Sequence, residues 1–221
     1  MSKLAPTVFV VDDDASFLRS IGRWLRGHGY IVKCYGSAAD FLARRPKQAT
    51  GCVVVDLQMP GMDGISFQKV LGHSDHPLPV VFLTGHGDIQ TSVAAMKGGA
   101  EDFLVKTASK DALLDAIERA LARDASEREV RLRQRAMSMR FAELTPREQE
   151  VLSHVLKGRL NKQIAIDLGI DERSVKRHRT NIMSKIGVKS VAELAQLAVV
   201  AGISEELRVP GDRLPLPTKH S

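Results

Sequence analysis

The chain has 221 residues, enough for one large or two small domains that each bury a core. Its 43% hydrophobic and 26% charged residues are ordinary for a globular protein, and two cysteines are too few for a disulfide framework. No signal peptide and no run of 18 apolar residues is present. We therefore expect a cytoplasmic protein that is neither secreted nor membrane-spanning.

The net charge of +6 is concentrated in one segment. Residues 1–123 carry 14 basic and 13 acidic side chains, whereas residues 157–189 carry nine basic and three acidic ones. The net charge of residues 157–189 therefore equals the net charge of the whole chain. It predicts a polyanionic partner at this segment, with a solvated charged face as the alternative.

The first 122 residues alternate strand and helix patterns. Apolar runs typical of buried strands are Thr7–Asp12, Tyr30–Tyr35, Cys52–Asp56, Val80–Thr84 and Asp102–Val105. Helical spacing predicts helices at Ala15–Gly27, Ala38–Arg45, from near Gly64, Ile89–Lys97 and Lys110–Ala122. The alternation predicts an α/β fold, a doubly wound parallel five-stranded sheet in flavodoxin-like order 2-1-3-4-5. A third strand then separates Cys34 from Cys52 by roughly 9 to 10 Å, too far for a disulfide.

The rest of the chain has a different composition. Residues 123–141 are rich in charges and helix formers, which predicts an exposed helical linker that either pairs with its own copy or serves as a solvated spacer. Residues 142–208 contain two capping boxes, Thr145–Glu148 and Ser190–Glu193, and predict a small all-α domain. The proline-containing tail, residues 209–221, is expected to be disordered.

Chemically active side chains follow four of the predicted strands. Asp12 and Asp13 follow the first strand, Asp56 the third, Thr84 the fourth and Lys106 the fifth. In the predicted strand order they crowd one pocket at the carboxyl edge, where open α/β sheets bind ligands. Clustered carboxylates repel one another, and a hard divalent cation relieves the repulsion. The set suits phosphoryl transfer to Asp56, with Mg²⁺ neutralising charge and Thr84 and Lys106 contacting the phosphoryl oxygens.

Five segments in the first half carry a family resemblance. They read VVDDD, VVVDLQMPGMDG, FLTGHGDI, AMKGGAEDFLVK and LLDAIERAL. In this order and spacing they resemble the receiver domain of two-component response regulators, over about residues 5–122. The resemblance implies that Asp56 is the phosphoacceptor. It also implies a Mg²⁺ or Mn²⁺ site made by Asp12, Asp13, Asp56 and the backbone carbonyl of Gln58.

The resemblance implies further roles around this site. Thr84 would be the switch hydroxyl, Lys106 the phosphate contact, and Phe103 the aromatic side chain that changes exposure on activation. Gln58 and His86 fall where side chains tune dephosphorylation in such domains, although a histidine there is equally compatible with plain loop surface.

One position departs from the receiver pattern. Receivers normally have a proline after this lysine, in a cis peptide that aims the ammonium, and here Thr107 follows Lys106. A non-prolyl cis bond costs about 3 to 4 kcal/mol, so we expect a trans bond. Lys106 is then expected to point differently and to weaken or slow phosphorylation.

The predicted helix Glu172–Lys185 has one cationic face. Its helical period groups Arg173, Lys176, Arg177 and Thr180 on that face. A short helix, a glycine-containing turn and this helix predict a helix-turn-helix. The segment LTPREQEVLSHVLKGRLNKQIAIDLGIDERSVKRHRTNIMSKIGVKSVAELAQLA resembles the LuxR-type DNA-binding domain, which makes the whole chain similar to NarL/FixJ-class regulators.

This second resemblance implies two kinds of DNA contact. Lys176, Arg177 and Thr180 would face base edges in the major groove. The expected phosphate contacts are Arg173, Arg179, Asn161 and Lys162. Arg179 borders the packing face of its helix.

Together these features predict a phosphorylation-switched transcription regulator, not an enzyme in the ordinary sense. A sensor histidine kinase would phosphorylate Asp56, and the protein would then form a homodimer on double-stranded DNA. Dimerisation would use either the face around the fourth helix, fifth strand and fifth helix, as in the family, or the apolar helix Val191–Val200. No membrane partner is expected.

Two alternatives stay open, and the first belongs to another class, the enzymes. A phosphatase with an aspartyl-phosphate intermediate often has a second acid two residues after the nucleophile, but Gln58 occupies that position. A DNA-binding protein that has lost phosphorylation would keep the acidic pocket only for protein contacts, and Thr107 is the sequence feature that supports it.

Overall fold

The computed structural model describes residues 7–85 and 88–203. The chain forms two compact units, Met1–Arg128 and Glu129–Ser221. His86 and the tail predicted for residues 209–221 lie outside the described residues. In the described part of the chain, no helix combines the length and the apolar character needed to cross a bilayer.

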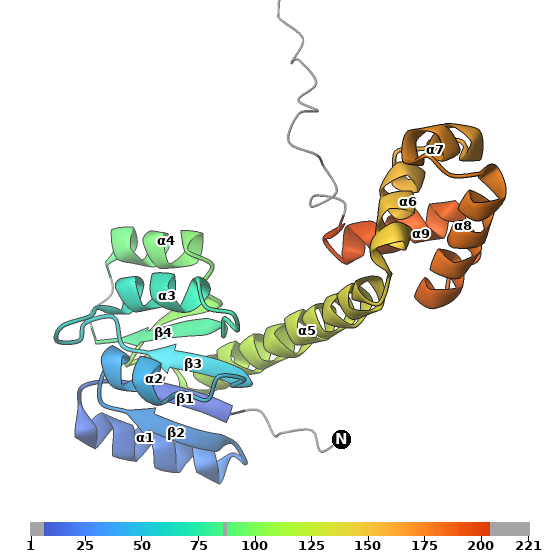
Figure 1. Ribbon diagram of the computed structural model, residues 1–221. Helices are drawn as coiled ribbons and strands as arrows, with labels where there is room; N and C mark the ends of the chain where they lie inside the picture. Colours follow the sequence, from blue (N-terminus) through green and yellow to red (C-terminus); the bar gives the residue numbers. More distant parts are fainter. Residues whose placement is uncertain (1–6, 86–87, 204–221) are drawn as a thin grey trace, which may run out of the picture. The chain divides into compact units, whose positions relative to one another are not determined.

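The first unit is a five-stranded parallel sheet in the order β2-β1-β3-β4-β5, as predicted (Figure 1). Its strands are β1 Thr7–Val11, β2 Ile31–Tyr35, β3 Gly51–Val55, β4 Val80–Thr84 and β5 Asp102–Val105. Its helices are α1 Ala15–Gly27, α2 Ala38–Arg44, α3 Gly64–Gly72, α4 Ile89–Lys97 and the first part of α5 Lys110–Ala142, which continues into the second unit. Each predicted strand and helix is present, although several ends differ by one residue.

Alternate side chains of the central strands lie in two different hydrophobic cores, one on each face of the sheet. Phe9 and Val55 point to a core shared with α2, α3 and α4, whereas Val8 and Val54 point to a core shared with α1 and α5. Helices therefore cover both faces of the sheet, and β3 is buried along its whole length. This burial explains why its sequence is a continuous apolar run. Cys34 and Cys52 are free, as predicted.

Helix α5 is longer than the predicted Lys110–Ala122, because the following charged segment continues it to Ala142. Asp124, which the sequence placed in an exposed linker, is only 3% exposed. One of its carboxylate oxygens accepts a hydrogen bond from the Gly51 N–H, 3.0 Å away. Gly51 has a φ of 131°, and a side chain there would collide with the Thr7 carbonyl. This buried hydrogen bond thus links the beginning of β3 to α5.

The second unit packs four further helices on the end of α5. They are α6 Pro146–Leu156, α7 Asn161–Leu168, α8 Glu172–Ile186 and α9 Val191–Val200. Phe141, Val151, Ile164 and Ile182 are among its buried core residues. Gly169 ends α7 with a left-handed φ of 63°, which allows the tight turn into α8. The predicted helix-turn-helix is therefore present (Figure 1).

Candidate functional site

Three carboxylates meet at the carboxyl edge of the sheet. Asp12 follows β1 and Asp56 follows β3, and the parallel pairing of Val11 with Val55 brings these strand ends together. One oxygen each of Asp12, Asp13 and Asp56 lies within 4.8 Å of the others. Asp12 and Asp56 are buried, whereas Asp13 is exposed. The predicted acidic cluster therefore has the compactness that a divalent cation requires.

The next residue, Asp14, caps helix α1 and is not part of the acidic cluster. Its carboxylate accepts hydrogen bonds from the N–H groups of Ser16 and Phe17, at 2.7 and 3.1 Å. These bonds cap the first turn of α1 and lower the pKa of Asp14. The Asp14 N–H in turn donates to Asp12, at 2.9 Å. Capping by Asp14 leaves Asp12 and Asp13 to face the pocket.

The Lys106 ammonium enters this pocket from the end of β5. Its Nζ lies 2.6 Å from Asp12 Oδ2 and 3.7 Å from Asp56 Oδ2. No cis peptide occurs among the described residues, so the bond to Thr107 is trans, as expected. The Lys106 ammonium nevertheless reaches both carboxylates, so the trans bond does not keep it out of the pocket. The expected effect of Thr107 on phosphorylation stays a prediction.

Asp56 is in an environment that disfavours its charge. Burial raises the pKa of its carboxyl, and the charges of Asp12 and Asp13 raise it further, whereas Lys106 and the Leu57 N–H lower it. Its Oδ1 is buried, and no described residue donates a hydrogen bond to that oxygen. A buried carboxylate oxygen in need of a partner, beside two further acids, fits a hard divalent cation.

The other predicted site residues lie on β4 and β5 and in the loop after β3. Thr84 ends β4 and is 1% exposed. Phe103 on β5 is partly buried, and its ring centre lies 5.9 Å from that of Phe82 on β4. Gln58 is exposed in the loop after β3. Thr84 is therefore at the carboxyl edge of the sheet, whereas Phe103 lies opposite Phe82 in the interior of β4. Their roles as switch hydroxyl and switch aromatic stay predictions.

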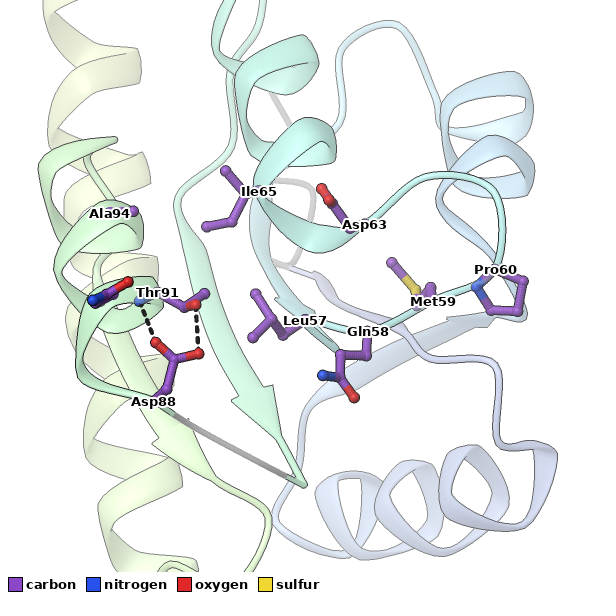
Figure 2. Close-up of a pocket in the computed structure, with 10 residues that line it drawn as sticks. Leu57, Gln58, Met59, Pro60, Asp63, Ile65, Asp88, Thr91 and Ala94 are labelled. Carbon is purple, nitrogen blue, oxygen red and sulfur yellow. Dashed lines mark hydrogen bonds between the residues drawn. The ribbon is translucent and has the colours of Figure 1, made fainter.

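Two features of this region were not predicted. The first is the Phe17 ring, whose centre lies 4.4 Å from Lys106 Nζ. The second is a pocket of about 820 Å³ beside the acidic cluster, lined by Leu57, Gln58, Met59, Pro60, Asp63, Ile65, Asp88, Gln90, Thr91 and Ala94. Figure 2 shows these side chains, including the paired hydrogen bonds from Thr91 to Asp88. No short motif marks either feature, because both depend on side chains from separate elements.

Helix α8 exposes its cationic face as the spacing predicted. Arg173, Lys176, Arg177 and Thr180 are exposed. On the opposite side, Val175, Ile182 and Ile186 are at most 1% exposed. Asp171 caps the start of the helix, because its carboxylate accepts a hydrogen bond from the Ser174 N–H at 2.8 Å. The polar face is therefore available to a ligand, and the apolar face packs in the core of the second unit.

The remaining predicted DNA contacts lie at the junction of α7 and α8. Arg179 donates a hydrogen bond to the side-chain oxygen of Asn161, at 2.8 Å, and both residues are partly buried. Lys162, in the first turn of α7, is exposed. The Arg179–Asn161 bond ties the two helices together, and this fits the position of Arg179 at the border of the packing face.

Comparison with protein families covers nearly the whole chain. Residues 8–118 match the response regulator receiver domain, and residues 142–198 match the bacterial regulatory proteins of the luxR family. The chain is 41% identical over 197 residues to nodulation protein W of Bradyrhizobium diazoefficiens, covering 89% of this chain and 87% of that protein. It is 39% identical over 200 residues to the transcriptional regulatory protein FixJ of Rhizobium meliloti, covering 89% and 96%.

Solved structures of response regulators also match the chain over most of its length. The response regulator StyR matches with a TM-score of 0.74 and 47% identity, covering 88% of this chain and 98% of that one. Full-length FixJ from B. japonicum matches with a TM-score of 0.54 and 36% identity, covering 90% and 98%. The chain therefore belongs to the NarL/FixJ class of two-component response regulators, which join a receiver domain to a LuxR-type DNA-binding domain.

Proposed function

We propose that a sensor histidine kinase transfers a phosphoryl group to Asp56 and that this transfer switches DNA binding by the second unit. The observation that carries the proposal is the buried Asp56 carboxylate within 4.8 Å of two further acids, with the Lys106 ammonium 3.7 Å away. A carboxylate nucleophile needs nearby positive charge, because the incoming group brings two negative charges.

The metal-binding residues would be Asp12, Asp13, Asp56 and the backbone carbonyl of Gln58. They offer the hard oxygen ligands that Mg²⁺ or Mn²⁺ prefers, and the buried Oδ1 of Asp56 would gain a partner. When bound, such an ion supplies charge neutralisation for the phosphoryl oxygens. Lys106 adds a further positive charge to the pocket, with its ammonium 3.7 Å from Asp56. Thr84 is at the end of the neighbouring strand, where its hydroxyl would meet the phosphoryl group.

Phosphorylation would change the receiver by selecting between two of its conformations. A phosphoryl group at Asp56 favours only a state that contacts it better, and Thr84 carries a hydroxyl at the end of the neighbouring strand β4. We propose that movement of Thr84 is coupled to a change in the exposure of Phe103, which is partly buried against Phe82. The receiver accepts the group and can lose it by hydrolysis, without turning over a further substrate.

Dimerisation would follow from apolar surface that the described structure leaves exposed. Ile89, Val93 and Met96 on α4 and Val105 on β5 are 40% to 83% exposed. Helix α9 exposes Val199 and Val200 at 64% and 45%. Both surfaces named from the sequence therefore offer apolar contact area to a second copy.

The active dimer would bind a two-fold site on double-stranded DNA. Lys176, Arg177 and Thr180 would read base edges, and Arg173, Arg179, Asn161 and Lys162 would contact phosphates. The exposed cationic face of α8 supports this division. Because its target is bacterial chromosomal DNA, we place the protein in the cytoplasm. The names of its relatives, such as the transcriptional regulatory protein FixJ, support the same output.

Gel-shift titration of the full chain tests the proposal. The wild type and Asp56→Asn are each titrated on a candidate promoter, with and without acetyl phosphate and Mg²⁺. We expect the wild type to gain the mass of one phosphoryl group and to bind DNA more tightly, and Asp56→Asn to do neither. Equal DNA affinity and no mass gain for the wild type would support the alternative in which the acidic pocket serves only protein contacts.

A further inference from the structure

The Lys106 ammonium has an aromatic ring on one side and carboxylates on the other. The Phe17 ring centre lies 4.4 Å from Nζ, within the range of a cation–π interaction. Asp12 and Asp56 approach the same nitrogen at 2.6 and 3.7 Å. The ammonium therefore has three groups of protein around it, and Phe17 is the one without a part in the proposed chemistry.

The position of Phe17 is fixed by the start of α1. The carboxylate of Asp14 accepts a hydrogen bond from the Phe17 N–H, so this residue lies in the first turn, beside the carboxyl edge of the sheet. Its side chain is partly buried against the core shared by α1 and α5. The ring is thus held by both the cap and the core, and it presents a rigid surface to Lys106.

Lys106 needs such a surface because its side chain is flexible and partly solvated. The side chain is 23% exposed. A lysine carries a hydrated point charge on a four-carbon stem, and it orders poorly unless neighbours restrain it. A hollow of about 170 Å³ adjoins it, lined in part by Phe17, Trp24 and Lys110. Without the ring, the stem has room to swing out of the acidic pocket.

We infer that Phe17 is a positioning residue for phosphoryl transfer, which holds the Lys106 ammonium beside Asp56 through the face of its ring. This inference rests on the proposed function of Asp56. It extends the catalytic pocket by one residue that carries no hydrogen-bonding group.

The inference is tested in the full chain with Phe17→Leu and with phenylalanine analogues at position 17 that carry one, two or three ring fluorines. Fluorine weakens the negative face of the ring while nearly preserving its shape, so packing and cation attraction are separated. The readout is the rate of phosphorylation by acetyl phosphate at fixed Mg²⁺, followed by intact mass. Thermal unfolding confirms that each variant is folded.

We expect Phe17→Leu to slow phosphorylation by about three- to tenfold, the range that a partly desolvated cation–π contact supports. The fluorinated series should slow it progressively at an unchanged unfolding temperature. In a Lys106→Met background, Phe17→Leu should have no further effect, because Phe17 acts through that lysine. As a matched control, Trp24→Leu removes the α1 ring that lies 5.6 Å from Lys110 Nζ, and it should leave the rate unchanged.

Each outcome decides one of the two proposals. A wild-type rate across the fluorinated series, or an equal effect of Phe17→Leu with and without Lys106, would overturn the positioning role and leave phosphorylation of Asp56 intact. If the wild type gains no more phosphoryl group than Asp56→Asn, the proposed function itself is wrong, and the role of Phe17 fails with it.

Discussion

Lys106 Nζ lies closer to Asp12 than to Asp56, at 2.6 Å from the first carboxylate and 3.7 Å from the second. The ammonium therefore pairs with a predicted metal ligand, on the side of the pocket where a divalent cation would bind. A lysine in this place reduces the repulsion between the carboxylates. It also competes with the cation for the same oxygen, and this competition is measurable.

Removal of the Lys106 charge should tighten metal binding. We expect Lys106→Met to bind Mg²⁺ at least about fivefold more tightly than the wild type, because a close charge interaction near a protein surface is worth on the order of 1 kcal/mol or more. Isothermal titration calorimetry of the unphosphorylated full chain measures the affinity. Lys110→Met removes the same charge from a neighbouring position and is the control. An equal gain in both variants would show a general charge effect and contradict the direct competition.

The environment of Asp56 predicts a pH-dependent cost to stability. Burial raises the pKa of this carboxyl in the folded state, so folding favours its protonated form. The penalty is absent below the ordinary aspartate pKa and grows as the pH rises through the raised folded-state pKa. In chelator, Asp56→Asn should therefore unfold at a higher denaturant concentration than the wild type at pH 7. The difference should narrow as the pH is lowered toward the ordinary aspartate pKa.

Trp24 makes this experiment specific to the receiver. It is the only tryptophan in the sequence, and it packs against the core shared by α1 and α5. Its fluorescence therefore follows the unfolding of the first unit in the full chain. A stability difference that stays constant as the pH falls from 7 to the ordinary aspartate pKa would show that the Asp56 charge is not the cause.

The sequence predicts the acidic cluster because only strand order and strand ends are needed to place it. Parallel strands carry their C-terminal residues to one edge, so Asp12 and Asp56 meet once β1 and β3 are neighbours. The exposed face of α8 is predictable for a similar reason, because the helical period of 3.6 residues places Arg173 and Thr180 on the side of the helix opposite Val175. In both cases the backbone geometry alone determines which side chains are together.

Two other features could not be read from the sequence, because they depend on contacts between distant elements. Phe17 fits the helical spacing of a core residue, and nothing in that spacing reveals that its ring also faces Lys106. Asp124 is in a strongly charged segment, where an acidic side chain is normally exposed. Its burial depends on α5 continuing past the edge of the sheet to meet Gly51, 73 positions away in the sequence.

Asp124 should be a stability determinant of the receiver. Asp124→Ala leaves the buried Gly51 N–H without its acceptor, and we expect it to lower the free energy of unfolding by about 1 to 3 kcal/mol. Asp124→Asn keeps an acceptor oxygen and should cost less. Glu127→Ala, on the same helix, removes a partly exposed pair with Arg123 and should cost about 0.5 kcal/mol or less. Denaturant titration followed by Trp24 fluorescence ranks the three variants, and equal losses would contradict a specific role for Asp124.

The two classes of proposed DNA contact should separate by sequence preference and salt dependence. Lys162→Ala removes a proposed phosphate contact on α7, so it should weaken binding to specific and random DNA alike and reduce the salt slope by about 0.9. Lys176→Ala removes a proposed base contact on the exposed face of α8. It should weaken binding to the specific site by about 1 to 3 kcal/mol and relax the preference at one base position.

Competition binding against a randomised site, repeated at several salt concentrations, measures both effects for each variant. The exposed Lys189, which has no proposed DNA contact, provides the control substitution Lys189→Ala. The Lys189→Ala variant should bind DNA about as tightly as the wild type, because the substitution removes no proposed contact and changes only the weak general attraction to DNA. If Lys176→Ala and Lys162→Ala both lose the same affinity on specific and random DNA, Lys176 contacts phosphate, and the division of the α8 face is wrong.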